Sequence, residues 1–243
     1  MKHWPFIVVV LVTLVVFETD TLWWPYIPLL SEHLPFGRTI AALRILAAIV
    51  IVWALTRRGL GFFGLGGNPL AGLLFAFITS APLWAPLALT APVAASIDPI
   101  ALAFGSFYFP FSEEIFYRAF AFGLLHRVAG VPFWIAAILT AIPFAAGHLY
   151  QADDLGSAVG TIAITMLGAV LFSWLYAAWD WNLWVPFGLH ACMNFWWSVF
   201  DVGDGAFAGW APTAMQLGCA GVAVAATLGW RWRNERQAAE ARA

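Results

Sequence analysis

Charged residues are scarce in this chain of 243 residues. Lysine and arginine together number 11 and aspartate and glutamate 13, so that only 10% of the residues are charged while 63% are hydrophobic. Soluble domains are about a quarter charged and roughly half apolar. The composition therefore predicts an integral membrane protein surrounded by a lipid bilayer. The formal net charge of −2 gives no reason to expect a nucleic-acid partner.

Cysteine is almost absent, because only Cys192 and Cys219 occur and both lie in apolar runs. This argues against a disulfide framework. The sequence also lacks an internal repeat and a low-complexity segment, so we expect a single membrane domain over residues 1–243. No small residues that would mark a signal cleavage site follow the first apolar run, which ends in the acidic sequence Glu-Thr-Asp. We therefore interpret that run as an uncleaved first span.

Long apolar runs dominate the rest of the chain. A spanning helix needs about 20 mostly apolar residues. Punctuation by charge, proline and glycine predicts eight spans, at residues 4–23, 39–56, 70–90, 100–125, 132–150, 157–178, 183–200 and 212–230. We expect an all-α polytopic membrane protein of about eight transmembrane helices with its site inside the bundle. The glycine-rich residues 59–68 are predicted to form a flexible cytoplasmic connector, with a re-entrant gate as the less favoured alternative.

The distribution of charge predicts the orientation. If both termini are cytoplasmic, the inside segments hold eight basic residues: Lys2, Arg57, Arg58, Arg127, Arg231, Arg233, Arg236 and Arg242. The outside loops then hold Arg38 alone, together with eight acidic residues: Glu18, Asp20, Glu32, Asp98, Asp153, Asp154, Asp201 and Asp204. Basic residues favour the cytoplasmic side. We therefore expect both termini inside, in a bacterial cytoplasmic membrane.

Few ionisable side chains lie inside the predicted spans. A charge at mid-bilayer costs at least a few kcal/mol, so each such residue is a functional hypothesis. Arg44 lies near the outer end of the second span and is interpreted as snorkelling to the interface. The remaining polar residues are Glu113, Glu114 and Arg118 in the fourth span, His148 at the end of the fifth, and His190 and Asn194 in the seventh.

Helical spacing arranges these residues into pairs. Residues four apart share a face of a helix, so Glu114 is expected to pair with Arg118. Glu113 points about 100° away around the helix and needs a different partner. The same spacing joins two further pairs, Phe144 with His148 and His190 with Asn194.

The set left over, one carboxylate with two imidazoles and one carboxamide, suits the addition of water to an amide carbonyl. A carboxyl group in a low-dielectric site can act as a general base or acid near neutral pH. One histidine can help to hold and deprotonate the water, while the second histidine and the asparagine amide donate hydrogen bonds to an oxyanion. Ser112 cannot share the face of its neighbour Glu113, so a serine nucleophile is not favoured.

Each of these groups also has a structural interpretation. The pair of Glu114 and Arg118 in the fourth span is interpreted first as a structural contact that holds helices together. Glu113 alone could form a hydrogen bond between helices. His148, near the outer interface, could simply be solvated, and His190 with Asn194 could join helices. Because so few polar groups occur elsewhere in the spans, their joint occurrence favours a functional site.

Three motifs together resemble one known family. They are Glu-Glu-x-x-x-Arg at 113–118, Phe-x-x-x-His at 144–148 and His-x-x-x-Asn at 190–194. Their order and their places on successive spans resemble the CAAX protease and bacteriocin-processing (CPBP, or Abi) family of intramembrane endopeptidases. The resemblance covers residues 100–200, which we expect to be the catalytic core.

The resemblance implies roles for the motif residues. Glu113 would be the catalytic base, His148 would help to activate the water, and His190 and Asn194 would stabilise the oxyanion. Glu114, Arg118 and Phe144 would support the site. A Glu/His/His set can also bind zinc, but the family resemblance favours a mechanism without a metal or other cofactor.

The resemblance implies an endopeptidase that cuts a membrane-anchored protein or peptide near its membrane-embedded or lipid-anchored end. The substrate could carry a prenylated CAAX tail, a bacteriocin leader or a sorting tail. Glu113, about 20 Å from the cytoplasmic end of its span, and His148 favour the outer half of the bilayer, whereas His190, about 10 Å into its span, lies deeper toward the cytoplasm. Two other functions compete. A proton-coupled transporter would be expected to show inverted repeats, and a non-catalytic immunity or scaffold protein would keep the motifs for structure. Oligomeric state is not predicted.

Overall fold

The computed structural model describes residues 4–203 and 205–240, and all regular structure in these residues is helical. The first half contains α1 (Trp4–Glu18), α2 (Asp20–Trp23), η1 (Trp24–Tyr26), α3 (Pro28–Ser31), α4 (Phe36–Thr56), η2 (Leu60–Phe63), α5 (Pro69–Thr79), α6 (Ala81–Thr90), α7 (Pro99–Ala103) and η3 (Phe104–Tyr108). The second half contains α8 (Phe109–Glu113), η4 (Glu114–Val128), α9 (Phe133–Ala146), η5 (Leu149–Gln151), α10 (Leu155–Ala178), α11 (Trp184–Val199) and α12 (Trp210–Glu240). The expectation of an all-α polytopic membrane protein is confirmed.

The number of spans is smaller by length and composition than the eight predicted. Among the described residues, α4, α10 and α12 are long and apolar enough to cross a membrane. Two bent pairs raise this to five, because α1 turns by 62° into α2 and η1, and α5 turns by 52° into α6. α9 is apolar but has only 14 residues. Every predicted span coincides with helical structure, but the bends and the short helices leave the number eight unconfirmed.

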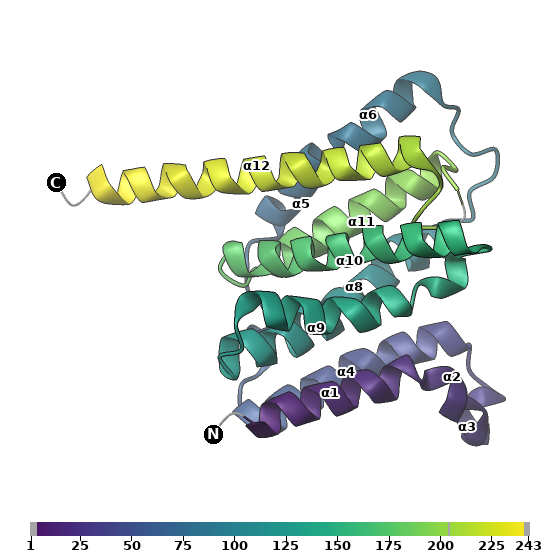
Figure 1. The fold of residues 1–243 in the computed structure, drawn as a ribbon, viewed down its shortest axis with the longest axis vertical. Coiled ribbons are helices and arrows are strands. Elements are labelled where there is room, and N and C mark those ends of the chain that lie inside the picture. Colours follow the sequence, from purple (N-terminus) through teal and green to yellow (C-terminus); the bar gives the residue numbers. More distant parts are fainter. Residues whose placement is uncertain (1–3, 204, 241–243) are drawn as a thin grey trace.

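The two ends of the bundle differ in charge. In Figure 1 the start of α1, the connector between α4 and α5, the end of η4 and the end of α12 lie at the left, whereas α2, α3 and the turn between α9 and α10 lie at the right. The left end therefore carries Arg57, Arg58, Arg127 and the arginines of the last turns of α12. This agrees with the expectation that both termini lie on one side. Lys2, Asp204 and Arg242, which entered the charge count, lie outside the described residues.

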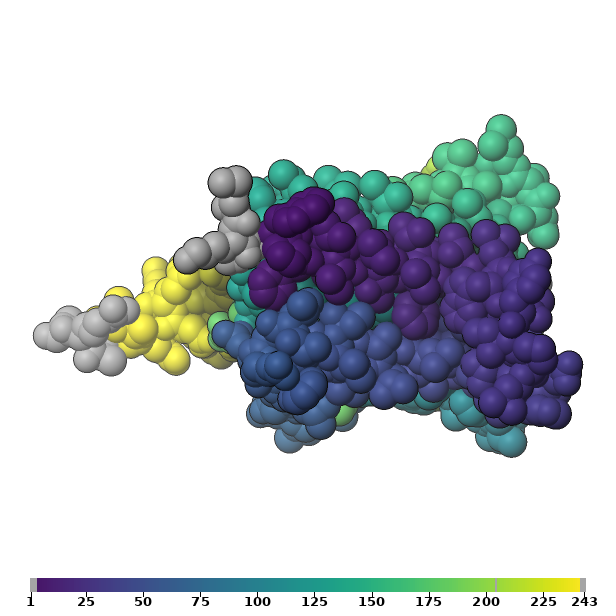
Figure 2. Space-filling model, turned by 90° about the horizontal axis from the view of Figure 1, so that it is seen from below, coloured from purple at the N-terminus to yellow at the C-terminus, as the bar shows by residue number. Residues whose placement is uncertain are grey.

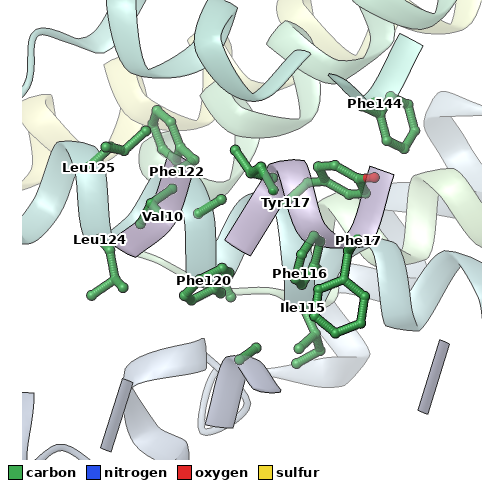
Figure 3. Packing of buried hydrophobic residues seen from close by; sticks show 14 of the residues in the cluster. Val10, Phe17, Ile115, Phe116, Tyr117, Phe120, Phe122, Leu124, Leu125 and Phe144 are labelled. Atoms are coloured by element: carbon green, nitrogen blue, oxygen red, sulfur yellow. The ribbon is translucent and has the colours of Figure 1, made fainter. Parts of the chain in front are cut away.

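One long helix runs through the centre of the bundle. It is formed by α7, η3, α8 and η4 in direct succession, and η3 and η4 are wound as π-helices with i→i+5 hydrogen bonds. Of the 15 residues of η4, 12 are buried. Figure 3 shows its aromatic side chains packed against Phe17 of α1 and Phe144 of α9. Short π-helical segments occur frequently at functional sites, and η4 begins at Glu114, directly after Glu113 at the end of α8.

The N-terminal helices form one face of the bundle. α1 and α4 lie side by side on this face, seen in Figure 2, and the end of α12 projects beyond it. Both helices pack against η4, so the buried apolar side chains of α1, such as Val10 and Leu14, belong to the same core as η4. A segment outside the predicted catalytic core therefore contacts the helix that carries the motif glutamates.

The glycine-rich connector is packed, and its predicted flexibility is wrong. Phe62 and Phe63 are buried, and the indole N–H of Trp184 donates to the carbonyl of Leu65 at 3.0 Å. Gly64 has φ = +74°, and a Cβ there would meet the carbonyl oxygen of Trp181 at 1.8 Å. The glycine is therefore required for close approach to the turn before α11.

A capped turn fixes the start of α10 just beyond His148. The carboxylate of Asp154 accepts a hydrogen bond from the backbone N–H of Ser157 at 2.8 Å, and the Ser157 hydroxyl oxygen accepts one from the backbone N–H of Asp154. These hydrogen bonds lower the pKa of the Asp154 carboxyl from its ordinary value. A capping box of this kind fixes where a helix begins, and here it defines the short loop that separates α9 from α10.

Candidate active site

The predicted site residues surround a single large cavity. Its volume is about 960 Å³, and it extends between the N-terminal helices on one side and α9 to α12 on the other. All four predicted catalytic residues line it, namely Glu113, His148, His190 and Asn194. They come from α8, the turn after α9, and α11, so three separate segments converge as the sequence predicted.

His190 lies between the two glutamates of the first motif. Its Nδ1 is 2.8 Å from Oε1 of Glu114, and its Nε2 is 3.8 Å from Oε2 of Glu113. The ring also stacks on Phe172, with centroids 5.2 Å apart. His190 is therefore the partner that Glu113 was expected to need, although Glu113 and Glu114 point to different sides of their helix.

Glu114 and Arg118 form the predicted pair, and both are completely buried. Nη1 of Arg118 lies 3.1 Å from Oε1 of Glu114. The guanidinium carbon lies over the rings of Phe144 and Phe172, at 4.4 and 5.3 Å from their centroids. Such cation–π contacts stabilise a desolvated cation. The pair holds Oε1 of Glu114 in place, so that the carboxyl group is a fixed partner for Nδ1 of His190.

His148 is held by its own helix. Its Nδ1 is 2.7 Å from the carbonyl oxygen of Phe144, and its ring lies 4.5 Å from the Phe144 ring. A carbonyl oxygen only accepts hydrogen bonds, so Nδ1 carries the proton and Nε2 is the basic nitrogen. His148 thus presents a proton acceptor from the cavity wall.

Asn194 is anchored to the π-helical segment. Its Nδ2 donates to the carbonyl of Gly105 at 3.2 Å, which leaves the second N–H of the same amide for another acceptor. Gly105 also lines the cavity. The carboxamide is therefore oriented by η3 and has one donor left over.

Glu113 and His190 meet although the sequence predicts different depths for them. They come from α8 and α11, and Nε2 of His190 lies 3.8 Å from Oε2 of Glu113.

The donor set does not fit a zinc site. Within residues 4–203 and 205–240, no three His, Cys, Asp or Glu side chains are arranged so that they could hold a metal ion. The contacts of His190 go to two carboxylates, one of which is already paired with Arg118.

A second polar cluster on the cavity wall was missed by the sequence reasoning. Arg44 does not snorkel to the interface, because Nη2 donates to the carbonyl of Phe17 at 3.1 Å and lies 3.5 Å from Glu18 and 3.6 Å from Asp20. Glu18 in turn accepts the hydroxyl proton of Tyr117. The sequence predicts that Arg44 snorkels and that Glu18 and Asp20 lie outside the membrane; in the structure all three line the cavity. The signal in the sequence that could have revealed this cluster was a basic residue within the second predicted span together with two acidic residues at the end of the first.

Comparison with known families agrees with the resemblance carried by the three motifs. Residues 94–196 match the sequence model of the family described as type II CAAX prenyl endopeptidase Rce1-like. The match includes all seven motif residues, from Glu113 to Asn194, and excludes α1 to α6. Searches of curated proteins and of solved structures gave no match.

Proposed function

We propose that the protein is an intramembrane endopeptidase, because residues 94–196 match the model of the Rce1-like family of type II CAAX prenyl endopeptidases. It hydrolyses a peptide bond near the membrane-embedded or lipid-anchored end of a protein substrate. The single observation that carries the proposal is that Glu113, His148, His190 and Asn194, from three separate segments, line one cavity.

In the proposed reaction, Glu113 and the basic Nε2 of His148 bind one water molecule between them. Glu113 accepts a proton from the water while the water oxygen attacks the substrate carbonyl carbon. The tetrahedral intermediate then collapses, the C–N bond breaks, and Glu113 returns the proton to the departing amine. A positioned carboxylate of this kind accelerates a reaction by about 10²–10⁴-fold.

His190 and Asn194 stabilise the oxyanion in this proposal. Nδ1 of His190 is bonded to Glu114, which orients the ring so that Nε2 faces the reacting centre near Glu113 and can donate its N–H to the oxyanion. The free N–H of Asn194 is the second donor.

The electrostatic environment disfavours the transporter alternative. A proton relay through the membrane needs titratable groups that lead from one side to the other. Glu114 and Arg118 are instead locked to each other and surrounded by aromatic rings. The site residues thus form one compact group, which suits a reaction better than a relay.

Two expectations about the surroundings of the site belong to the same proposal. The protein lies in a bacterial cytoplasmic membrane with both termini cytoplasmic, and the substrate reaches the cavity from the extracytoplasmic side. The arginines at the left end of the bundle and the place of His148 near the opposite end support this orientation.

The test is a cleavage assay with purified protein in detergent. The substrates are a farnesylated CAAX peptide and an unprenylated peptide of the same sequence fused to a transmembrane anchor, with products identified by mass spectrometry. We expect one defined cleavage, unchanged by a chelator. No cleavage of either substrate, together with proton flux into liposomes that contain the protein, would favour the transporter.

A further inference from the structure

The polar cluster formed by Glu18, Arg44 and Tyr117 lies outside the family's motifs but adjoins the same cavity. Glu18 and Arg44 come from α1 and α4, neither of which is part of the segment that matches the family. Two of these three side chains are charged, in a part of the chain where charge is costly. Charged side chains that are costly to bury suggest a functional role, and the contacts of Glu18 indicate what that role is.

Glu18 is held on two sides by groups of its own neighbourhood. It accepts the hydroxyl proton of Tyr117 and lies 3.5 Å from Nη2 of Arg44. Arg44 is fixed in turn by the carbonyl of Phe17 and by Asp20. The Glu18 carboxylate thus has a charge partner and a donor, so its position is well determined.

Tyr117 connects Glu18 to the predicted site. It lies one turn after Glu113 on the central helix, and its ring meets the Phe144 ring edge-on with centroids 5.0 Å apart. Figure 3 shows Tyr117 between Phe17 and Phe144. The Phe144 ring in turn contacts the imidazoles of His148, at 4.5 Å, and His190, at 6.5 Å.

Glu18 also closes against the turn that carries His148. A Cβ at Gly147 would lie 3.0 Å from Oε2 of Glu18. The carboxylate therefore packs directly on the backbone next to His148. One side chain of the first helix thus touches both the helix of Glu113 and the turn of His148, the two groups that must share one water.

We propose that Glu18 is a positioning residue for hydrolysis, which holds Tyr117 and the Gly147–His148 turn so that Glu113 and His148 face each other across the cavity. The proposal rests on the proposed endopeptidase function. It assigns to the N-terminal helices a part in catalysis, although they lie outside the segment that the family shares. Displacement of a catalytic group by about 1 Å can cost about 100-fold in rate.

The test compares four variants in the farnesylated-peptide cleavage assay, with rates expressed per folded protein by size-exclusion chromatography. Glu18→Ala removes both contacts, and we expect kcat to fall about 10- to 100-fold with KM changed by less than about threefold. Glu18→Gln keeps the shape and the acceptor for Tyr117, and we expect it to retain kcat within about threefold. Tyr117→Phe removes only the hydrogen bond to Glu18, so we expect a smaller fall in kcat than for Glu18→Ala, and the double variant Glu18→Ala/Tyr117→Phe should be no worse than Glu18→Ala, which already lacks that hydrogen bond.

Asp20→Asn is the matched control. Asp20 also pairs with Arg44, whereas the hydroxyl of Tyr117 donates to Glu18, so the kcat of Asp20→Asn should stay within about threefold of the wild type. If Glu18→Ala keeps the wild-type kcat, or if Glu18→Gln loses as much as Glu18→Ala, the positioning role is wrong. Glu113→Gln distinguishes the proposed endopeptidase mechanism from the positioning role of Glu18. An active Glu113→Gln variant overturns the endopeptidase mechanism itself. An inactive Glu113→Gln variant together with a fully active Glu18→Ala variant overturns only the positioning role.

Discussion

At the scale of single residues, the central feature is an imidazole held between two carboxylates. The spacing of the sequence correctly paired Glu114 with Arg118 and left Glu113 without a partner on its own helix. It could not show that His190 reaches both acids, since that depends on how α11 crosses the central helix. The contacts give Glu114 a definite task, which is to fix the ring of His190 by its Nδ1.

Substitution of Glu114 should separate support from catalysis. Glu114→Gln leaves Arg118 buried without its counter-charge, and removal of one partner of a buried ion pair costs about 3–5 kcal/mol. We expect a lower thermal midpoint and a lower yield of folded protein, measured by thermal-shift chromatography in detergent. Glu113→Gln, which leaves the pair intact, should melt near the wild type, and the opposite order would mean that the two glutamates have exchanged roles.

Asn194 gives a prediction about the oxyanion. Asn194→Ala removes a donor to the developing charge, and loss of one such donor typically costs about 10²–10³-fold in kcat. Steady-state cleavage kinetics would measure this, with Cys192→Ala as the control, because Cys192 lies two residues away on α11 and packs against an apolar cluster that includes Leu175 and Leu189. A kcat for Asn194→Ala equal to that of the control would remove Asn194 from the mechanism.

At the scale of elements, the sequence predicted where helices lie better than how they are wound. Apolar runs and punctuation located the longer helices from α1 to α12, but not the short η1, α3 and η2. They could not reveal the π-helical winding of η4, because no residue in that stretch breaks an α-helical pattern. They also misread the glycine-rich connector, since glycine promotes flexibility and close packing alike, and only the contact of Gly64 with Trp181 decides between them.

The contact between α5 and α11 also depends on glycine. A Cβ at Gly72 would lie 2.5 Å from the carbonyl oxygen of Trp184, and one at Gly188 would lie 3.0 Å from the carbonyl oxygen of Gly72. Gly72→Ala should therefore push α11 away and cost about 1–3 kcal/mol, seen as a lower thermal midpoint, with reduced cleavage because α11 carries His190. Gly221→Ala, at a helical position with open space around it, should leave both values near those of the wild type. Equal stability of the two variants would contradict the close packing.

At the scale of the whole molecule, charge and topology point in the same direction. The arginines gather at the end of the bundle where α1 starts and α12 ends, as basic residues on the cytoplasmic side would. Residues of the turn between α9 and α10, at the opposite end of the bundle, line the cavity. The sequence predicted this orientation from charge alone, and it remains a prediction.

Cysteine labelling in intact cells would test the orientation. In a background that lacks Cys192 and Cys219, a cysteine at Ala152 should react with a membrane-impermeant maleimide from outside. A cysteine at Gly59, the matched position in the connector at the other end, should react only after the membrane is permeabilised. Labelling of position 152 only after permeabilisation would place the cavity on the cytoplasmic side.

The measurement that bears most directly on the whole account is the cleavage rate of Glu113→Gln. The substitution keeps the size of the side chain and removes its capacity to accept a proton from water. If the residues that line the cavity act together as a peptidase, purified and folded Glu113→Gln should cleave the farnesylated peptide about 10³-fold more slowly than the wild type, or not measurably. Cleavage at the wild-type rate would contradict the account.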